Sequence, residues 1–111
     1  MSKKQITPDS GKQKQLSFKT RNFGTVYIVP CGYVDSGCPA IQLLDNNDDL
    51  IAVLSVNLPN CAGLLFEGEF FARTWNDNEE IAEDALASGL FRDTGRTSVE
   101  TVNAQIWKLL P

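Results

Sequence analysis

Asp93, Thr94 and Gly95 are the residues most suggestive of catalysis, because they reproduce the three-residue core of aspartic proteases. Such enzymes can form when two short chains each supply one aspartate, and the two carboxylates share a proton in an enclosed site. Proteases of this kind place apolar strand residues before the aspartate, whereas Arg92 stands there in this chain and Arg96 follows the glycine. The favoured interpretation is therefore structural: Asp93 bonds to its own backbone and to the flanking arginines, and Gly95 supplies a turn. A dimeric aspartic hydrolase that uses Asp93 is the distant alternative.

No other catalytic set can be recognised in the sequence. The chain has no histidine, the commonest general base, and it has no nucleophile elbow, Walker loop or dinucleotide fingerprint. Three cysteines, Cys31, Cys38 and Cys61, are too widely spaced for a zinc site, which needs four ligands in close pairs. We therefore expect a non-catalytic protein with three reduced thiols, no metal site and no cofactor.

Acidic residues gather in two segments that could imitate the phosphates of a nucleic acid. One is a predicted helix with Glu79, Glu80, Glu83 and Asp84, and the other is the run 45–49, Asp-Asn-Asn-Asp-Asp. An ordinary solvated helix face and a plain turn are the commoner explanations of such patterns. The run also has oxygen ligands that suit calcium, but it lacks the central glycine and the distal glutamate of a helix-loop-helix calcium loop.

Charge is divided unevenly along the 111 residues. Residues 1–21 hold six basic residues and one acid, for a net charge of +5, and the remainder has a net charge of −9, which gives the overall −4. We predict a flexible basic tail over residues 1–15 and a single domain over residues 16–111. The tail could contact nucleic acid through phosphate charge, but solubility is the commoner purpose of such tails, so nucleic acid is not the favoured partner.

A hairpin at mid-chain organises the predicted fold. Ala40–Leu44 and Leu50–Leu58 alternate in strand fashion on either side of the turn at residues 45–49, and in the second strand every other residue from Leu50 onward is apolar. We therefore place Leu50, Ala52, Leu54, Val56 and Leu58 on one core-facing side. The fold class predicted is α+β, an antiparallel sheet of about five to six strands with one helix, about residues 77–88, packed on it.

The other elements follow from composition and from a change of period. Asn76 and Glu79 can form a capping box at the start of the helix, and Gly89 can end it in a left-handed conformation. Pro30-Cys31-Gly32 is expected to break the second strand, and residues 90–96 are expected to form a loop. The remaining strands are predicted at Leu16–Arg21 on an edge, Thr25–Val29, Glu69–Trp75 and Ala104–Leu110.

Several stretches resemble a family of short uncharacterised proteins that are carried by phages, plasmids and conjugative elements. The resemblance covers about residues 18–110, and its most specific parts are Leu-Ser-Val-Asn-Leu-Pro at 54–59 and Asp-Thr-Gly-Arg at 93–96. It implies no catalytic residue. It implies a small accessory protein of a mobile element, and such proteins often act by binding a host protein, including components of host defence.

These observations predict a binding protein as the function, with inhibition of a host defence system such as CRISPR-Cas as its specific form. The alternative is a regulator of element maintenance that binds a small molecule or a nucleic acid. No apolar run is long enough to span a membrane and the lysine-bearing N-terminus does not resemble a secretion signal, so we expect the cytoplasm of a bacterial host. The predicted binding residues are Trp75, Glu79, Glu80, Glu83, Asp84, Arg92, Asp93 and Arg96.

Overall fold

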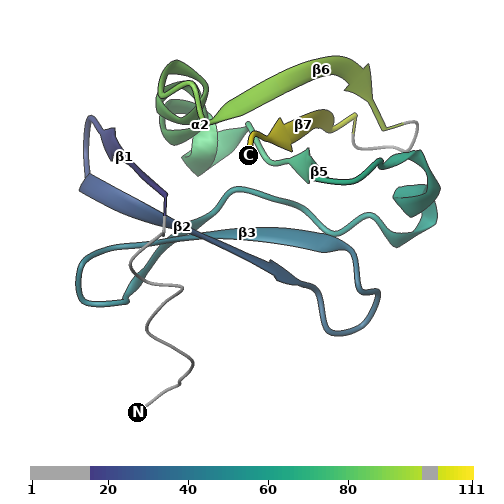
Figure 1. The fold of residues 1–111 in the computed structure, drawn as a ribbon, viewed down its shortest axis with the longest axis horizontal. Coiled ribbons are helices and arrows are strands. Elements are labelled where there is room, and N and C mark those ends of the chain that lie inside the picture. The colour runs from purple at the N-terminus through teal and green to yellow at the C-terminus, as the bar shows by residue number, and fades with distance from the viewer. Residues whose placement is uncertain (1–15, 99–102) are drawn as a thin grey trace.

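The computed structural model describes residues 16–98 and 103–111, which form seven strands, one α-helix and two short 3₁₀ helices. The predicted basic tail, residues 1–15, lies outside the described residues. The strands form two antiparallel sheets, and the helix lies beside both of them (Figure 1). The predicted α+β class is therefore confirmed, although the described strands number seven and are divided between two sheets rather than joined in one.

Antiparallel pairing of neighbouring strands accounts for both sheets. The first sheet has the order β1 (Ser17–Thr20), β2 (Gly24–Gly32), β3 (Pro39–Leu44) and β4 (Leu50–Val53), so the predicted hairpin and edge strand are confirmed. In the second sheet β7 (Gln105–Leu109) lies between β5 (Glu69–Ala72) and β6 (Phe91–Thr97). The helical elements are η1 (Pro59–Leu64), η2 (Asn76–Asn78) and α2 (Glu79–Ala87).

The chain crosses from one sheet to the other inside the stretch predicted as a single strand, Leu50–Leu58. Pairing with β3 stops at Val53, and Ser55 then forms an isolated bridge with Ala72 of β5. The side chain of Ser55 makes this corner possible, because its Oγ accepts the Ile41 backbone N–H at 3.0 Å in place of a strand carbonyl. Every buried backbone donor needs a partner, so a serine at this position allows the strand to leave β3. The prediction is wrong beyond Val53.

A bulge in β4 reverses the expected direction of its first residue. Leu43 lies opposite Ala52, but Leu44 lies opposite Leu50, which leaves Ile51 as the extra residue. An extra residue exchanges the two faces of a strand, because side chains alternate with a period of two. Leu50 therefore points outward with 55% of its surface exposed, contrary to its predicted place in the core.

Two predicted interruptions are in fact parts of strands. Residues 91–97 were expected to be mostly loop but form β6, because Gly95, at a φ of +83°, creates a bulge within the strand rather than an end to it. Pro30 does not break β2 either. The Ile28 N–H points away from β3 and bonds to the Leu16 carbonyl, beside β1. Backbone directions repeat every two residues in a strand, so the Pro30 nitrogen also points away from β3. Because proline lacks an N–H only on that side, the pairing of β2 with β3 loses no hydrogen bond.

The helix begins later than predicted and without the expected cap. Asn76 has a φ of +56° and begins η2, and α2 starts only at Glu79, so no capping box forms. Asn78 stands at the N-cap position, but its buried amide donates to the carbonyls of Val53 at 2.7 Å and Arg73 at 3.1 Å. The other end is as predicted: Gly89 is left-handed at a φ of +82°.

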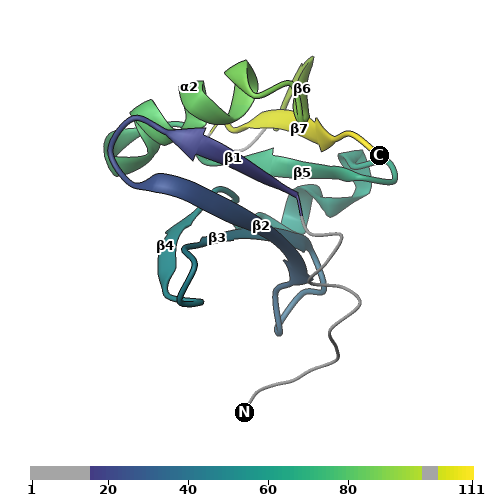
Figure 2. The same cartoon turned by 60° about the vertical axis from the view of Figure 1, so that its left-hand side comes forward.

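Helix α2 covers the gap between the outer strands of the two sheets, β1 and β6, and contacts both (Figures 1 and 2). The main core lies beneath it and contains four aromatic rings in edge-on or tilted contact, with centroids 5.8–6.3 Å apart. Such contacts contribute about 0.5–1.5 kcal/mol each beyond area burial. The rings belong to Phe18, Phe70, Phe91 and Trp107, so they tie β1 to all three strands of the second sheet.

Candidate functional site

The β1–β2 turn, Arg21–Phe23, contacts the acidic side of α2. The Arg21 guanidinium lies 3.0 Å from both Glu83 Oε1 and Asp84 Oδ1. The backbone N–H of Arg21 also donates to Asp84 Oδ2 at 3.0 Å. Asn22 donates from its side-chain amide to Glu80 Oε1. The backbone bond from Arg21 is the main reason that the pKa of Asp84 is lowered, and the two carboxylates in turn raise the pKa of Arg21. These bonds fix the turn against the helix.

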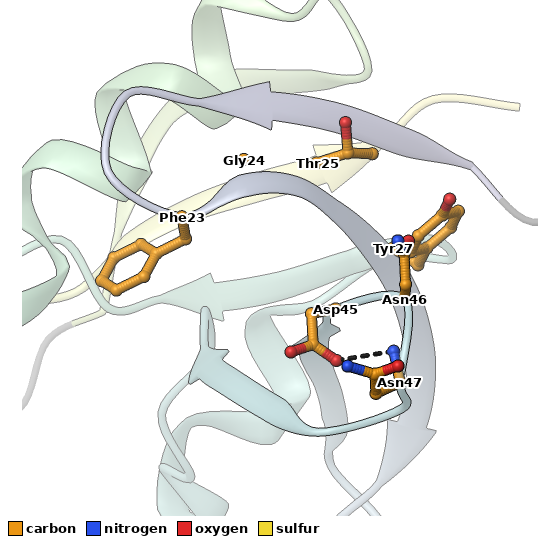
Figure 3. A pocket seen from close by; sticks show the side chains of 7 residues that line it. All are labelled: Phe23, Gly24, Thr25, Tyr27, Asp45, Asn46 and Asn47. Carbon is orange, nitrogen blue, oxygen red and sulfur yellow. Dashed lines mark hydrogen bonds between the residues drawn. The ribbon is translucent and has the colours of Figure 1, made fainter.

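On its other side the same turn borders a shallow hollow of about 440 Å³ (Figure 3). The exposed ring of Phe23 and the half-buried ring of Tyr27 lie at opposite ends of the hollow in this view. The β3–β4 turn closes the lower side, where Asp45 Oδ1 accepts the backbone N–H groups of Asn47 at 2.8 Å and Asp49 at 3.0 Å. The predicted Asp/Asn turn is thus confirmed. The lining residues are Phe23, Gly24, Thr25, Tyr27, Asp45, Asn46 and Asn47.

The β1–β2 turn therefore has an acidic segment on each side of it. Helix α2 contributes Glu79, Glu80, Glu83 and Asp84, and the β3–β4 turn contributes Asp45, Asp48 and Asp49. All three segments lie on the same side of the molecule, at the left of Figure 1. We call this region the turn-side surface: residues 21–25 and 27, the turn 45–49, and the four acidic residues of α2. Its centre is Phe23, of which 53% is exposed.

The sequence-predicted binding residues are not brought together in one place. Four of the eight, the acids of α2, belong to the turn-side surface, although three of these bond to Arg21 or Asn22. Trp75 is half-buried and packs against a second apolar cluster beneath η1. The last three, Arg92, Asp93 and Arg96, lie on β6.

The residues Asp93-Thr94-Gly95-Arg96 build the bulge of β6. Asp93 Oδ1 accepts the Gly95 N–H at 2.9 Å, and Thr94 Oγ1 donates to the Ile106 carbonyl at 2.7 Å. The expectation that Asp93 bonds to its own backbone is therefore confirmed. The expected pairing of Asp93 with the flanking arginines is wrong: among the described residues neither Arg92 nor Arg96 pairs with it, and the bulge directs Arg96 to Glu69.

Arg96 contacts β5, the end of η1 and the loop between them. Its guanidinium forms an ion pair with Glu69, donates to the Leu64 carbonyl at 2.9 Å, and lies 4.9 Å from the ring centroid of Phe66. Glu69 is buried, which by itself would raise its pKa, but the bonds from Arg96 and from the Phe66 N–H outweigh burial and lower the pKa overall. Arg96 therefore has a structural part in this chain.

The second motif of the resemblance is also used by the fold. Leu54 and Leu58 are buried in the two apolar clusters, and Ser55 forms the corner between the sheets. Asn57 accepts a hydrogen bond from the Ser36 hydroxyl at 2.9 Å, and Pro59 begins η1. Neither motif lines the hollow.

The described residues do not assemble a reaction centre that we can identify. Asp93 is exposed, and among residues 16–98 and 103–111 no three histidine, cysteine or acidic side chains gather in a way that could hold a metal ion. All three cysteines are free; Cys38 and Cys61 are buried, and partial burial raises the pKa of the more exposed Cys31. None of the helices in the described part of the chain has the length and apolarity to cross a membrane.

In comparisons with known proteins, no family model, no curated protein and no solved structure matches this chain. The site is therefore assigned from its geometry. Sequence reasoning missed the three side chains that line the hollow from the β1–β2 turn and β2, although one signal was available: a phenylalanine in the middle of a tight polar turn has no core to enter. The missed residues are Phe23, Thr25 and Tyr27.

Proposed function

We propose that this chain is a non-catalytic accessory protein of a phage or other mobile element and that it binds a protein partner through the turn-side surface. The partner is a protein of the bacterial host cytoplasm, and a component of a defence system such as a CRISPR effector is the class that the resemblance favours. The support for this context is the resemblance of the two motifs alone. The support for binding is the surface itself.

One observation carries the proposal: an exposed aromatic side chain stands between two acidic segments that the fold fixes in place. Phe23 is half exposed, the hydrogen bonds of Arg21 and Asn22 hold its turn against α2, and Asp45 holds the opposite turn in shape. Aromatic anchors in a polar rim are typical of binding hot spots, and a pre-organised surface loses less entropy when it binds. Because the turn-side surface is acidic, it favours a partner with a basic surface. Such complementary charge speeds association and disfavours partners of like charge.

The acidic surface also separates this proposal from nucleic-acid binding. A phosphate backbone would be repelled by seven carboxylates, so a nucleic acid could be held only elsewhere, for instance by the basic residues of 1–15. A host protein whose own nucleic-acid site is basic has the complementary charge, and blocking that site would inhibit it. This is the inhibitory form of the proposed function.

Capture from bacterial lysate tests the proposal. The tagged full chain is immobilised beside two variants, Phe23→Ala in the turn-side surface and Val34→Ala, a matched removal of a fully exposed apolar side chain at another loop. We expect wild type and Val34→Ala to retain the same protein by mass spectrometry, and Phe23→Ala to lose at least about tenfold, because hot-spot truncation costs about 2 kcal/mol or more. Retention should also fall as salt rises.

Two outcomes would overturn the proposal. One is a captured protein that Phe23→Ala retains as well as the wild type does. The other is salt-dependent binding of labelled DNA or RNA with no protein retained after nuclease treatment, which would favour the regulatory alternative.

A further inference from the structure

We propose that the hollow beside Phe23 is a pocket for a guanidinium group, and that the proposed partner inserts an arginine side chain there. This inference rests on the proposed function, because it names the residue by which a basic protein would be recognised. It concerns a hollow of which the sequence patterns indicated only the turn 45–49.

The lining of the hollow offers hydrogen-bond acceptors. Asp45 uses Oδ1 for the two backbone bonds of its turn, and no described residue bonds to its Oδ2. The hydroxyls of Thr25 and Tyr27 and the side-chain carbonyls of Asn46 and Asn47 likewise have no hydrogen bond to another described residue. Amides and hydroxyls can reorient to accept, but a carboxylate can only accept at neutral pH. Asp45 is the one charged residue of the lining, so the hollow carries a negative charge.

The aromatic rings add a geometric preference. A guanidinium is planar, carries five donors and no acceptor, and stacks on aromatic faces, whereas an ammonium is a compact and strongly hydrated charge. Phe23 and Tyr27 contribute aromatic side chains at the two ends of the hollow, and Asp45 lies between them in Figure 3. A volume of about 440 Å³ is within the range of small-ligand sites and leaves room for the side chain and neighbouring backbone.

An arginine of the partner fits better than one from this chain. Arg21 is bonded to α2, Arg96 to Glu69, and Arg92 lies on β6. Arg73, the fourth arginine, directly follows β5, where its backbone N–H donates to the Leu54 carbonyl. Residues 1–15 contain four lysines and no arginine. A site that prefers guanidinium over ammonium therefore selects a foreign segment over the chain's own basic residues.

The experiment is an NMR titration of the full, ¹⁵N-labelled chain with three blocked tripeptides, Gly-X-Gly, in which X is arginine, lysine or citrulline. Citrulline has the shape of arginine without its charge. We expect the arginine peptide to shift the amides of Gly24, Thr25, Tyr27 and Asn47, with a dissociation constant on the order of 1 mM, as suits one exposed side chain. The lysine peptide should bind at least about threefold more weakly and the citrulline peptide more weakly still.

Matched variants assign the pocket. Asp45→Asn keeps the Oδ1 acceptor of the turn and removes the charge, and Phe23→Ala removes one ring. Each should weaken arginine binding about threefold to tenfold, while Val34→Ala should not change it. Equal binding of the three peptides, or binding that survives both variants, would overturn the inference. So would a shift of the same amides in Lys12→Gln/Lys14→Gln without peptide, because the chain's own segment would then be the occupant.

The peptide titration and the lysate capture can fail independently of each other. If lysate capture depends on Phe23 but no arginine peptide binds, the partner docks without an arginine in the hollow and only the inference fails. If the peptide binds as expected and no protein is captured, the pocket stands and the proposed partner class is wrong.

Discussion

Two regions of this molecule each pair an arginine with acidic side chains, and they use the same chemistry for different ends. In one, Arg96 also lies over the Phe66 ring; in the other, Arg21 stands two residues before Phe23 in the same turn. At the bulge of β6, Arg96 pairs with Glu69, whose side chain is only 7% exposed, and lies 4.9 Å from the ring centroid of Phe66. At the turn-side surface, Arg21 pairs with Glu83 and Asp84, and 45% of the Arg21 side chain and 68% of the Glu83 side chain are exposed.

The difference in burial decides what each pair can do. A buried carboxylate that loses its partner cannot be hydrated, so the bulge pair is required once Glu69 has been placed inside. An exposed pair contributes little net stability, because water and salt screen it. We conclude that the first pair holds the second sheet to η1, whereas the second pair sets the orientation of the β1–β2 turn and hence of Phe23.

The largest expected effect comes from breaking the bulge pair. Arg96→Gln leaves Glu69 buried without its cation and should lower the free energy of unfolding by about 2 kcal/mol, which is less than for a fully buried pair because Arg96 is partly exposed. Urea unfolding followed by circular dichroism measures it. Arg92→Gln, four residues earlier on β6 and with an exposed side chain, is the control and should change little. Equal losses in the two variants would contradict the distinction between the regions.

The dependence of stability on pH gives the next effect in size. The pKa of Glu69 is lowered in the folded state, so Glu69 contributes stability above its unfolded pKa, about 4.3, and that contribution disappears as pH falls through the lower folded value. Unfolding measured from pH 7 down to pH 2 should therefore show a loss in the acid range that is reduced in Glu69→Gln. Asp84, whose pKa is also lowered, contributes in the same direction. An unchanged acid limb in Glu69→Gln would show that other carboxylates account for the whole loss.

The parts of the fold that could be predicted from the sequence are those that depend on interactions between residues close together in the chain. The hairpin, the body of the helix and the final strand were predicted because each depends on a local period of apolar residues. The corner at Ser55 was not, because a side-chain hydroxyl replaces a backbone carbonyl there, and nothing in an alternating pattern indicates that exchange. Asp93–Arg96 was expected to be a loop because a polar segment with glycine looks the same in a bulge and in a turn.

The candidate site was only half predicted for the same reason. The acids of α2 and of the turn 45–49 could be chosen by charge, but the hollow between them depends on strand register. Tyr27 lies opposite Leu44 in β3, so the β3–β4 turn is carried up beside Thr25 and Phe23, which are about twenty residues away in the chain. The two motifs of the resemblance drew attention to residues that build the fold and not to this surface.

The smallest expected effect on stability, and the sharpest test of the comparison, comes from Arg21. Arg21→Gln removes the exposed ion pairs but keeps the backbone bond to Asp84, so the urea midpoint should stay close to that of the wild type, with Lys19→Gln as a control for the loss of one positive charge nearby. The amides of Asn22, Phe23 and Gly24 should nevertheless exchange with solvent severalfold faster than in the control, because the turn is then less firmly held to α2. Raising the salt concentration should bring the wild type toward the variant, since screening weakens the same pairs. If Arg21→Gln instead lowers stability as much as Arg96→Gln does, the exposed pair supports the fold after all, and orientation of Phe23 is not its main role.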